Sequence, residues 1–291
     1  MSQDLSVKDC HKEIILELSD KFFVNQEPGK FLEDFTFYEF SLEELSLPDH
    51  LEILDSVQKI SSEVGLVGWR KEQGESKFYR GFSLTYNPDF FDQEASIYHQ
   101  TWGSSLLKQS FGRNIDLGLH GTTKNNYYDT YGFRSFPPLV RLNLGKFLDL
   151  FRFSILRSRV AYYYMHGVSP KDTSGWHVDE YPYQLLRINI PLQTSEEYIL
   201  DIEGVDEFGN SLSIKNKHLE TGKVYIWNTR IPHRVGINKK CLTKQPRIHL
   251  VLGVSPYFDY DTDNDRFVKN QYFGRNLNDL IKEKSFVKSL R

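Results

Sequence analysis

The feature of this sequence that most limits its fold is a run of short apolar segments between residues 158 and 256. Seven stretches rich in β-branched and aromatic side chains follow one another there, separated by turn-forming residues. Such stretches are typical of β-strands, and the intervals between them do not fit alternating strand–helix–strand units. We therefore predict an antiparallel sandwich or barrel of the jelly-roll or cupin type. The predicted strands span residues 159–167, 184–193, 197–202, 210–214, 223–228, 233–238 and 247–255.

The rest of the chain has a different pattern. Apolar residues recur at helical spacing in several segments, while residues 78–86 alternate like a strand. A long polar loop rich in Gly, Asn and Tyr covers residues 112–137. The predicted helices span residues 5–24, one or two segments within 41–64 broken near Pro48, residues 139–151, and a surface helix at 277–290.

These elements predict an α+β protein that forms one domain over residues 1–291. Residues 1–157 are expected to be a helical or mixed N-terminal part that carries the long loop. Residues 158–256 are expected to form the β core, and residues 257–291 a C-terminal extension with its helix.

Composition and charge exclude several classes of protein. The sequence holds 36 Lys and Arg against 39 Asp and Glu, so it lacks the basic excess of sequence-independent nucleic-acid binding. Cys10 and Cys241 are too few for a disulfide framework or a thiolate zinc site. The first residues are polar, and no apolar run approaches the roughly 20 residues of a membrane helix. We expect a cytoplasmic protein with no nucleic-acid partner and no integral membrane association.

One His-x-acid pair lies in a context that favours metal binding. His177 and Asp179 stand two residues apart, and on extended backbone such side chains project from the same face. His233 opens a later predicted strand. Two His and one carboxylate form the facial triad of non-haem Fe(II) oxygenases, which leaves coordination positions open. The other His-x-acid pairs lie in helical segments or a polar turn and are interpreted as surface residues: His11/Glu13, His50/Glu52 and His218/Glu220.

Arg247 begins the last predicted strand, fourteen residues after His233. Alternation along the strand places Arg247, His249 and Val251 on one face, opposite an apolar face. A buried guanidinium is costly unless it meets an anion, so this position predicts a carboxylate partner.

The order His-x-Asp, distal His and then Arg on a β-rich half resembles the Fe(II)/2-oxoglutarate-dependent dioxygenase superfamily. Within it, the segments LLRINIPLQT, GKVYIWNTRIPHRVGIN and PRIHLVLGV are similar to the aspartyl/asparaginyl β-hydroxylase family. The similarity covers about residues 158–256. It implies a double-stranded β-helix core with flanking N-terminal helices and a C-terminal helix.

The resemblance implies that His177, Asp179 and His233 bind Fe(II). Members of the family that modify peptides in vertebrates have Gly in place of the carboxylate, whereas Asp179 is present here. The chain is therefore more similar to bacterial hydroxylases that act on small molecules or lipids. Asp179 also argues against halogenation, because halogenases of the superfamily leave that position to chloride.

The resemblance also implies cosubstrate contacts. Arg247 would bind the distal carboxylate of 2-oxoglutarate, and Arg187 would hold the cosubstrate or a substrate carboxylate. Asn189 stands where the family strand usually has His, which is a departure from the pattern.

Substrate contacts are predicted from position alone. Trp176 and Tyr181 flank the His-x-Asp pair, and the loop 112–137 holds further candidates, namely His120, Tyr128 and Arg134. Long loops often act as lids, and Arg134 or Arg187 is a candidate for a substrate carboxylate.

The resulting prediction is an oxygenase that uses Fe(II), 2-oxoglutarate and O2 to hydroxylate an unactivated C–H bond, with release of succinate and CO2. The predicted substrate is a small molecule such as an amino acid or an amino-acid-like metabolite. Two alternatives stay open: a lipid- or peptide-modifying hydroxylase of the same family, and a non-catalytic cupin-like metal-binding protein.

Overall fold

The computed structural model describes residues 22–23, 25–68, 78–88, 130–170 and 175–288, and its strand pairs are all antiparallel. An eight-stranded sheet has the order β1-β9-β6-β11-β5-β3-β2, with β4 pairing to β11, and a three-stranded sheet has the order β10-β7-β8. The strands are β1 (Phe37–Ser41), β2 (Val67–Gly68), β3 (Tyr79–Ser83), β4 (Ser154–Ile155), β5 (Arg159–Tyr163), β6 (Leu186–Gln193), β7 (Tyr198–Val205), β8 (Ser211–His218), β9 (Lys223–Trp227), β10 (His233–Ile237) and β11 (Arg247–Ser255), followed by the hairpin β12 (Phe258–Asp261) and β13 (Arg266–Lys269).

The predicted antiparallel β core is confirmed at this level. Each of the seven strands predicted between residues 158 and 256 corresponds to one of β5 to β11. The prediction of a strand within residues 78–86 is also confirmed by β3. Strand β1 was not predicted. It pairs with β9 at one edge of the large sheet, where Phe37 stands opposite Trp227.

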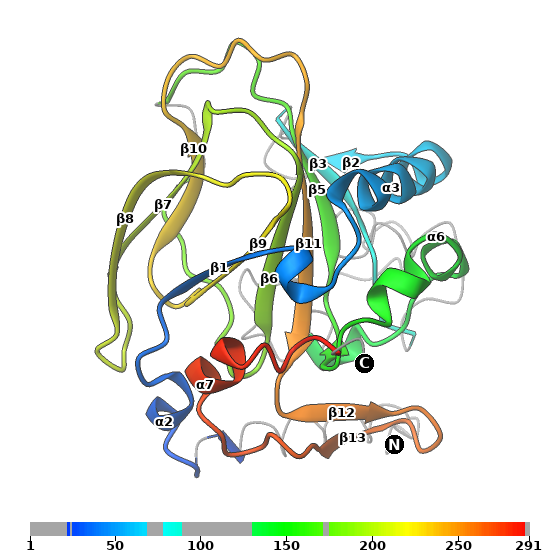
Figure 1. Cartoon of the computed structure of the whole chain (residues 1–291), viewed down its shortest axis with the longest axis vertical. Helices are drawn as coiled ribbons and strands as arrows, with labels where there is room; N and C mark the ends of the chain where they lie inside the picture. Colours follow the sequence, from blue (N-terminus) through cyan, green and yellow to red (C-terminus); the bar gives the residue numbers. More distant parts are fainter. Residues whose placement is uncertain (1–21, 24, 69–77, 89–129, 171–174, 289–291) are drawn as a thin grey trace, which may run out of the picture.

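Helices α3 (His50–Val64) and α6 (Pro138–Leu148) lie on one side of the large sheet, and the small sheet lies on the other (Figure 1). Helix α3 begins after Pro48, where the side chain of Asp49 accepts a hydrogen bond from the Leu51 N–H, so the predicted break is confirmed. The helix predicted at residues 139–151 is confirmed, and it runs from Pro138 to Leu148. The helical elements are α2 (Gly29–Leu32), the 3-10 turn η1 (Glu43–Leu45), α3 (His50–Val64), the 3-10 turn η4 (Thr130–Gly132), α6 (Pro138–Leu148) and α7 (Leu277–Lys282).

The C-terminal segment is not a surface helix, contrary to the prediction. Helix α7 is short, and Leu280, Ile281 and Phe286 are buried. The chain then passes Phe151, which forms a β-bridge with Val287. The apolar residues of this segment are part of the main core, because burying large apolar side chains is more favourable than leaving them exposed to water. The predicted helix at 5–24 lies almost wholly outside the described residues.

The two faces of β11 have different chemistry although the whole strand is buried. Ile248, Leu250 and Leu252 belong to the main apolar core, which draws residues from Phe23 to Val287. Arg247 and His249 alternate with them and therefore point to the opposite face, toward the small sheet. Between the sheets, the Tyr198 hydroxyl of β7 donates to the Tyr163 carbonyl of β5 at 3.1 Å. Polar groups are thus enclosed between the two sheets.

Within the described residues, no helix combines the length and apolar character needed to cross a bilayer.

Gly253 of β11 packs so closely that any side chain would clash. A Cβ there would lie 2.6 Å from the Arg157 carbonyl oxygen and 2.7 Å from a Leu185 methyl group. We expect Gly253→Ala to lower the free energy of unfolding by about 2 kcal/mol, because a tightly packed core cannot absorb the extra carbon. Gly145→Ala in α6 is the matched control, since its nearest neighbour would be 3.9 Å away. Chemical denaturation should show that only the β11 variant is destabilised; equal stability of the two would contradict this packing.

Candidate metal centre

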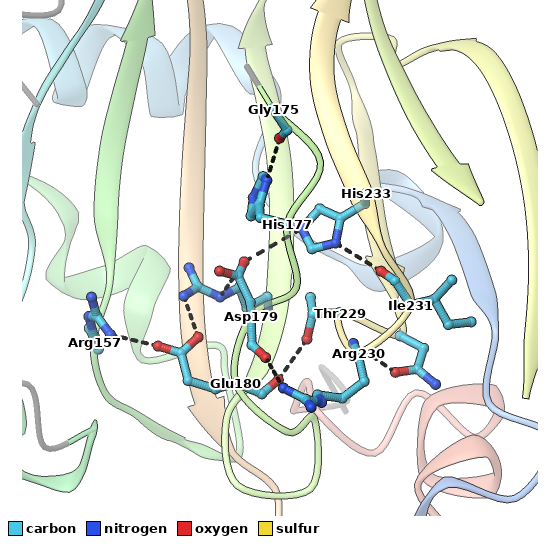
Figure 2. A network of polar contacts seen from close by, with 11 residues as sticks. Arg157, Gly175, His177, Asp179, Glu180, Thr229, Arg230, Ile231 and His233 are labelled. Atoms are coloured by element: carbon cyan, nitrogen blue, oxygen red, sulfur yellow. Dashed lines mark hydrogen bonds and ion pairs between the residues drawn. The ribbon is translucent and has the colours of Figure 1, made fainter. Parts of the chain in front are cut away.

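A β-bridge joins His177 and His233, whose side chains lie near each other in Figure 2. The N–H of His177 donates to the carbonyl of His233 at 3.1 Å, and the N–H of His233 donates to the carbonyl of His177 at 2.9 Å. Their ring centroids are 4.5 Å apart. Asp179 follows on the same face, and its N–H donates to the Thr229 carbonyl at 2.9 Å. One ligand atom from each of the three side chains lies within 4.8 Å of the other two.

Hydrogen bonds to carbonyls orient both imidazoles. Nδ1 of His177 lies 3.0 Å from the Gly175 carbonyl oxygen, and Nδ1 of His233 lies 3.1 Å from the Ile231 carbonyl oxygen (Figure 2). A carbonyl only accepts, so each Nδ1 carries the hydrogen and each Nε2 keeps its lone pair. Nε2 of His233 lies 3.6 Å from Oδ2 of Asp179. The Nε2 atoms are therefore the free metal donors.

The charge states also suit a metal ion. Desolvation and the neighbouring His233 lower the pKa of His177, which keeps its imidazole neutral. Burial alone would raise the pKa of Asp179, but the neighbouring Arg187 guanidinium acts against burial, and this pKa lies well below its usual range. Neutral imidazole and ionised carboxylate are the forms that bind metals. Among the described residues, this is the group of His, Cys, Asp and Glu side chains with metal-binding spacing.

A carboxylate that was not predicted stands beside the triad. Glu180 accepts from Arg157 Nη1 at 2.6 Å and from Arg187 Nη2 at 2.6 Å. Arg187 Nε lies 3.4 Å from Oδ2 of Asp179. Sequence alone offered only the position of Glu180 next to Asp179 as a signal, because Arg157 precedes it by 23 residues.

The loop before β10 holds the backbone of this segment. The Thr229 hydroxyl donates to the Glu180 carbonyl at 2.9 Å, and Arg230 Nη1 donates to the Asp179 carbonyl at 3.1 Å (Figure 2). The two segments that carry the three triad residues are thus tied together at backbone level.

Arg247 is a buried cation without a carboxylate partner among the described residues. Its side chain lies over the Tyr163 ring at 5.1 Å, and its Nε donates to His249 Nε2 at 2.6 Å. Burial lowers the pKa of Arg247, and burial together with Arg247 holds the pKa of His249 well below its usual value. His249 is therefore a neutral acceptor, and the charge of Arg247 is left for an anion to balance.

Four N–H donors on this face of the large sheet are buried and have no hydrogen-bond partner in the described structure. Asn189 of β6 stands opposite Tyr225 of β9 and Val251 of β11, and alternation brings the other donors to the same face. The ring of Trp227 also contacts that of His233, with centroids 5.8 Å apart. Buried donors without hydrogen-bond partners on one face fit a ligand rich in acceptors. The four atoms are Arg187 Nε, Asn189 Nδ2, Trp227 Nε1 and Arg247 Nη1.

Two of the predicted substrate residues, Trp176 and Tyr181, lie beside the triad. Trp176 is 45% exposed, and the Arg234 guanidinium lies 4.8 Å from its ring. Tyr181 stacks on Tyr183, and the Arg230 guanidinium lies over the Tyr181 ring, 4.3 Å from its centroid. Both lie next to the triad in the chain.

Arg134 is engaged with the β12–β13 hairpin, where it forms an ion pair with Asp265 at 2.9 Å. It also donates to the Tyr260 hydroxyl at 3.1 Å. Tyr128 and His120 lie outside the described residues.

No protein-family model matches the chain, and no curated protein matches it. Similar solved structures include the non-heme alpha ketoglutarate dependent epimerase SnoN from nogalamycin biosynthesis, at 12% identity over 80% of this chain and 82% of that one, with a TM-score of 0.36. A prolyl-4-hydroxylase from Pseudomonas putida covers 79% of this chain and 97% of its own at 12% identity, with a TM-score of 0.35. IDO from Bacillus thuringiensis matches at 12% identity over 86% and 97%, with a TM-score of 0.36. TM-scores this low assign neither a family nor an activity to the chain.

Proposed function

We propose that the protein is an Fe(II)- and 2-oxoglutarate-dependent oxygenase that hydroxylates an unactivated C–H bond of a small molecule. The observation that carries this proposal is the combination of a two-His, one-carboxylate cluster with a buried Arg247 that lacks a carboxylate partner in the described structure. A metal-binding protein without a cosubstrate has no need for such a cation, because burying an unpaired guanidinium is costly.

The proposed metal ligands are His177, Asp179 and His233. Two imidazoles and one carboxylate match the ligand set of non-haem Fe(II) oxygenases. Bound iron supplies the O2 activation and the oxidation that no side chain can perform. The overall reaction consumes one C–H bond, O2 and 2-oxoglutarate, and yields the alcohol, succinate and CO2.

The polar face of the large sheet is the proposed cosubstrate site. Arg247 is proposed to bind the distal carboxylate of 2-oxoglutarate as a charge-assisted pair, and so to fix the orientation of the cosubstrate. Arg187 and Asn189 are proposed to contact its remaining oxygens, since each has a buried N–H without a partner in the described residues. The two sheets are then the halves of a double-stranded β-helix within one catalytic domain over residues 1–291.

On the substrate side, Trp176 and Tyr181 are proposed to line the entrance, and an amino acid or a similar metabolite is the proposed substrate class. Arg134, Tyr128 and His120 stay candidates for substrate contacts, and Arg134 is the one proposed for a substrate carboxylate. A cytoplasmic location stays a prediction from the sequence.

Anaerobic titration of the metal-free protein with Fe(II) and then 2-oxoglutarate tests the proposal. A weak charge-transfer band in the visible is expected, because the cosubstrate chelates iron at open coordination positions. A screen for substrate-dependent succinate release would follow. Iron binding without such a band would refute the proposal and favour a cupin-like metal-binding protein.

His249 is expected to keep Arg247 in place for the cosubstrate. His249→Phe removes the acceptor of the 2.6 Å hydrogen bond from Arg247 while it keeps a ring of similar size. We expect the Kd for 2-oxoglutarate to rise about tenfold, in line with a lost hydrogen bond to a charged group. The affinity for Co(II) should not change, because His249 is not a ligand. Calorimetric titration measures both, and a parallel loss of the two affinities would speak against this role.

A further inference from the structure

Glu180 lies next to the proposed ligand Asp179 and forms ion pairs with two arginines, Arg157 and Arg187. Its carboxylate meets Arg157 on one oxygen and Arg187 on the other, each at 2.6 Å. The Thr229 hydroxyl donates a hydrogen bond to the Glu180 backbone carbonyl (Figure 2). The side chain is 23% exposed. A partly buried carboxylate with two short, charge-assisted bonds has a well-defined position.

Arg187 is held more strongly by Glu180 than by Asp179. Its Nη2 donates to Glu180 at 2.6 Å, whereas its Nε lies 3.4 Å from Oδ2 of Asp179 and has no hydrogen-bond partner in the described residues. Arg187 therefore acts on Asp179 as a nearby charge without taking up its lone pairs.

The same oxygen of Asp179 faces the metal donors. Oδ2 lies 3.6 Å from Nε2 of His233, within the cluster that fits a metal ion. If Arg187 moved the remaining distance to Asp179, its guanidinium would compete with the metal for this oxygen. The position of Arg187 therefore decides how available the carboxylate is.

We infer that Glu180 is a positioning residue of the metal centre: it holds Arg187 back from Asp179 and so keeps the carboxylate available to the metal. This inference rests on the metal centre of the proposed function. It assigns a role to a residue that neither binds the metal nor contacts the cosubstrate.

The test is Glu180→Gln, which keeps the shape of the side chain and removes its charge. Arg187 is then expected to pair fully with Asp179, and the affinity for Co(II), measured by calorimetry without 2-oxoglutarate, should fall about tenfold, as is typical when an outer partner of a metal ligand is lost. Glu180→Asp retains the charge and should recover part of the affinity.

Glu39→Gln is the matched control. Glu39 also bridges two cations, Lys217 and Lys223, at 2.7 Å each, and its side chain is 27% exposed. It lies on β1 at the edge of the large sheet and is not part of the metal centre. The control should lose a similar pair of ion pairs but bind Co(II) as the unaltered protein does.

A second comparison asks whether Glu180 acts through Arg187. In an Arg187→Met background, Glu180→Gln should no longer change the affinity, because the competing guanidinium is absent. An undiminished effect in that background would overturn the inference, as would a folded Glu180→Gln variant that binds Co(II) normally. Circular dichroism and thermal unfolding check that each variant is folded. If the unaltered protein itself binds no Co(II), the proposed function fails as well, so the two failures are distinguishable.

Discussion

His177→Ala is expected to weaken metal binding by more than about 100-fold and to abolish 2-oxoglutarate turnover. The change removes one of three ligands, so the loss should exceed the 10- to 100-fold typical of outer partners. The side chain is exposed, and it offers a free Nε2 while Nδ1 is bonded to the Gly175 carbonyl. The free energy of unfolding of the metal-free protein should therefore change by no more than about 0.5 kcal/mol.

His166→Ala is a close control for this experiment. His166 is also exposed, and its Nδ1 lies 3.1 Å from the Leu242 carbonyl oxygen, much as Nδ1 of His177 lies near Gly175. His166 does not belong to the group of His177, Asp179 and His233. Calorimetric titration with Co(II) should separate the two variants clearly. Equal metal affinity in both would show that the cluster is not the metal site.

Arg247→Met is expected to raise the Kd for 2-oxoglutarate roughly 100-fold, with little effect on metal affinity. Loss of a buried charge-assisted partner costs about 3 kcal/mol, which corresponds to that factor. The comparison ligand is 2-oxopentanoate, which keeps the 2-oxo acid but lacks the distal carboxylate. It should bind the variant and the unaltered protein equally, because Arg247 is proposed to contact only the missing group. An equal loss of affinity for both ligands would mean that Arg247 does not contact the distal carboxylate.

The same substitution is expected to leave the metal-free protein at least as stable. Arg247 is buried without a carboxylate partner in the described residues, and burial lowers its pKa, so the folded state disfavours its charge. Met fills a similar volume without that penalty. Chemical denaturation should show an equal or higher free energy of unfolding, whereas a large decrease would mean that Arg247 holds the fold together.

The β core could be predicted because its strands have a local signal. In β11 the period of two separates Arg247 and His249 from Ile248 and Leu250, and the structure places these pairs on opposite faces. Strand β1 was missed although Phe37 and Tyr38 have high β-propensity, because its partner β9 lies far along the chain. The C-terminal segment was read correctly as helical at Leu277 but wrongly as exposed, since amphipathic spacing does not reveal what covers a helix.

The grouping of the three side chains could be predicted because the i, i+2 spacing of His177 and Asp179 is local, and His233 stands at the start of a recognisable strand. The contacts around it could not. Glu180 accepts a hydrogen bond from Arg157, which lies 23 residues earlier in the chain, and no pattern in the sequence relates the two residues.

By itself the sequence determined strands β5 to β11, the local spacing of His177 and Asp179, and the side of β11 on which Arg247 lies, because each depends on backbone periodicity over a few residues. Tertiary structure alone decided that His177 and His233 pair across a bridge, that Arg187 stands between Asp179 and Glu180, and that Arg247 faces His249 and no carboxylate among the described residues. The bridge joins segments distant in the chain, and the groups that face Arg187 and Arg247 depend on how the two sheets pack, which local preference does not specify.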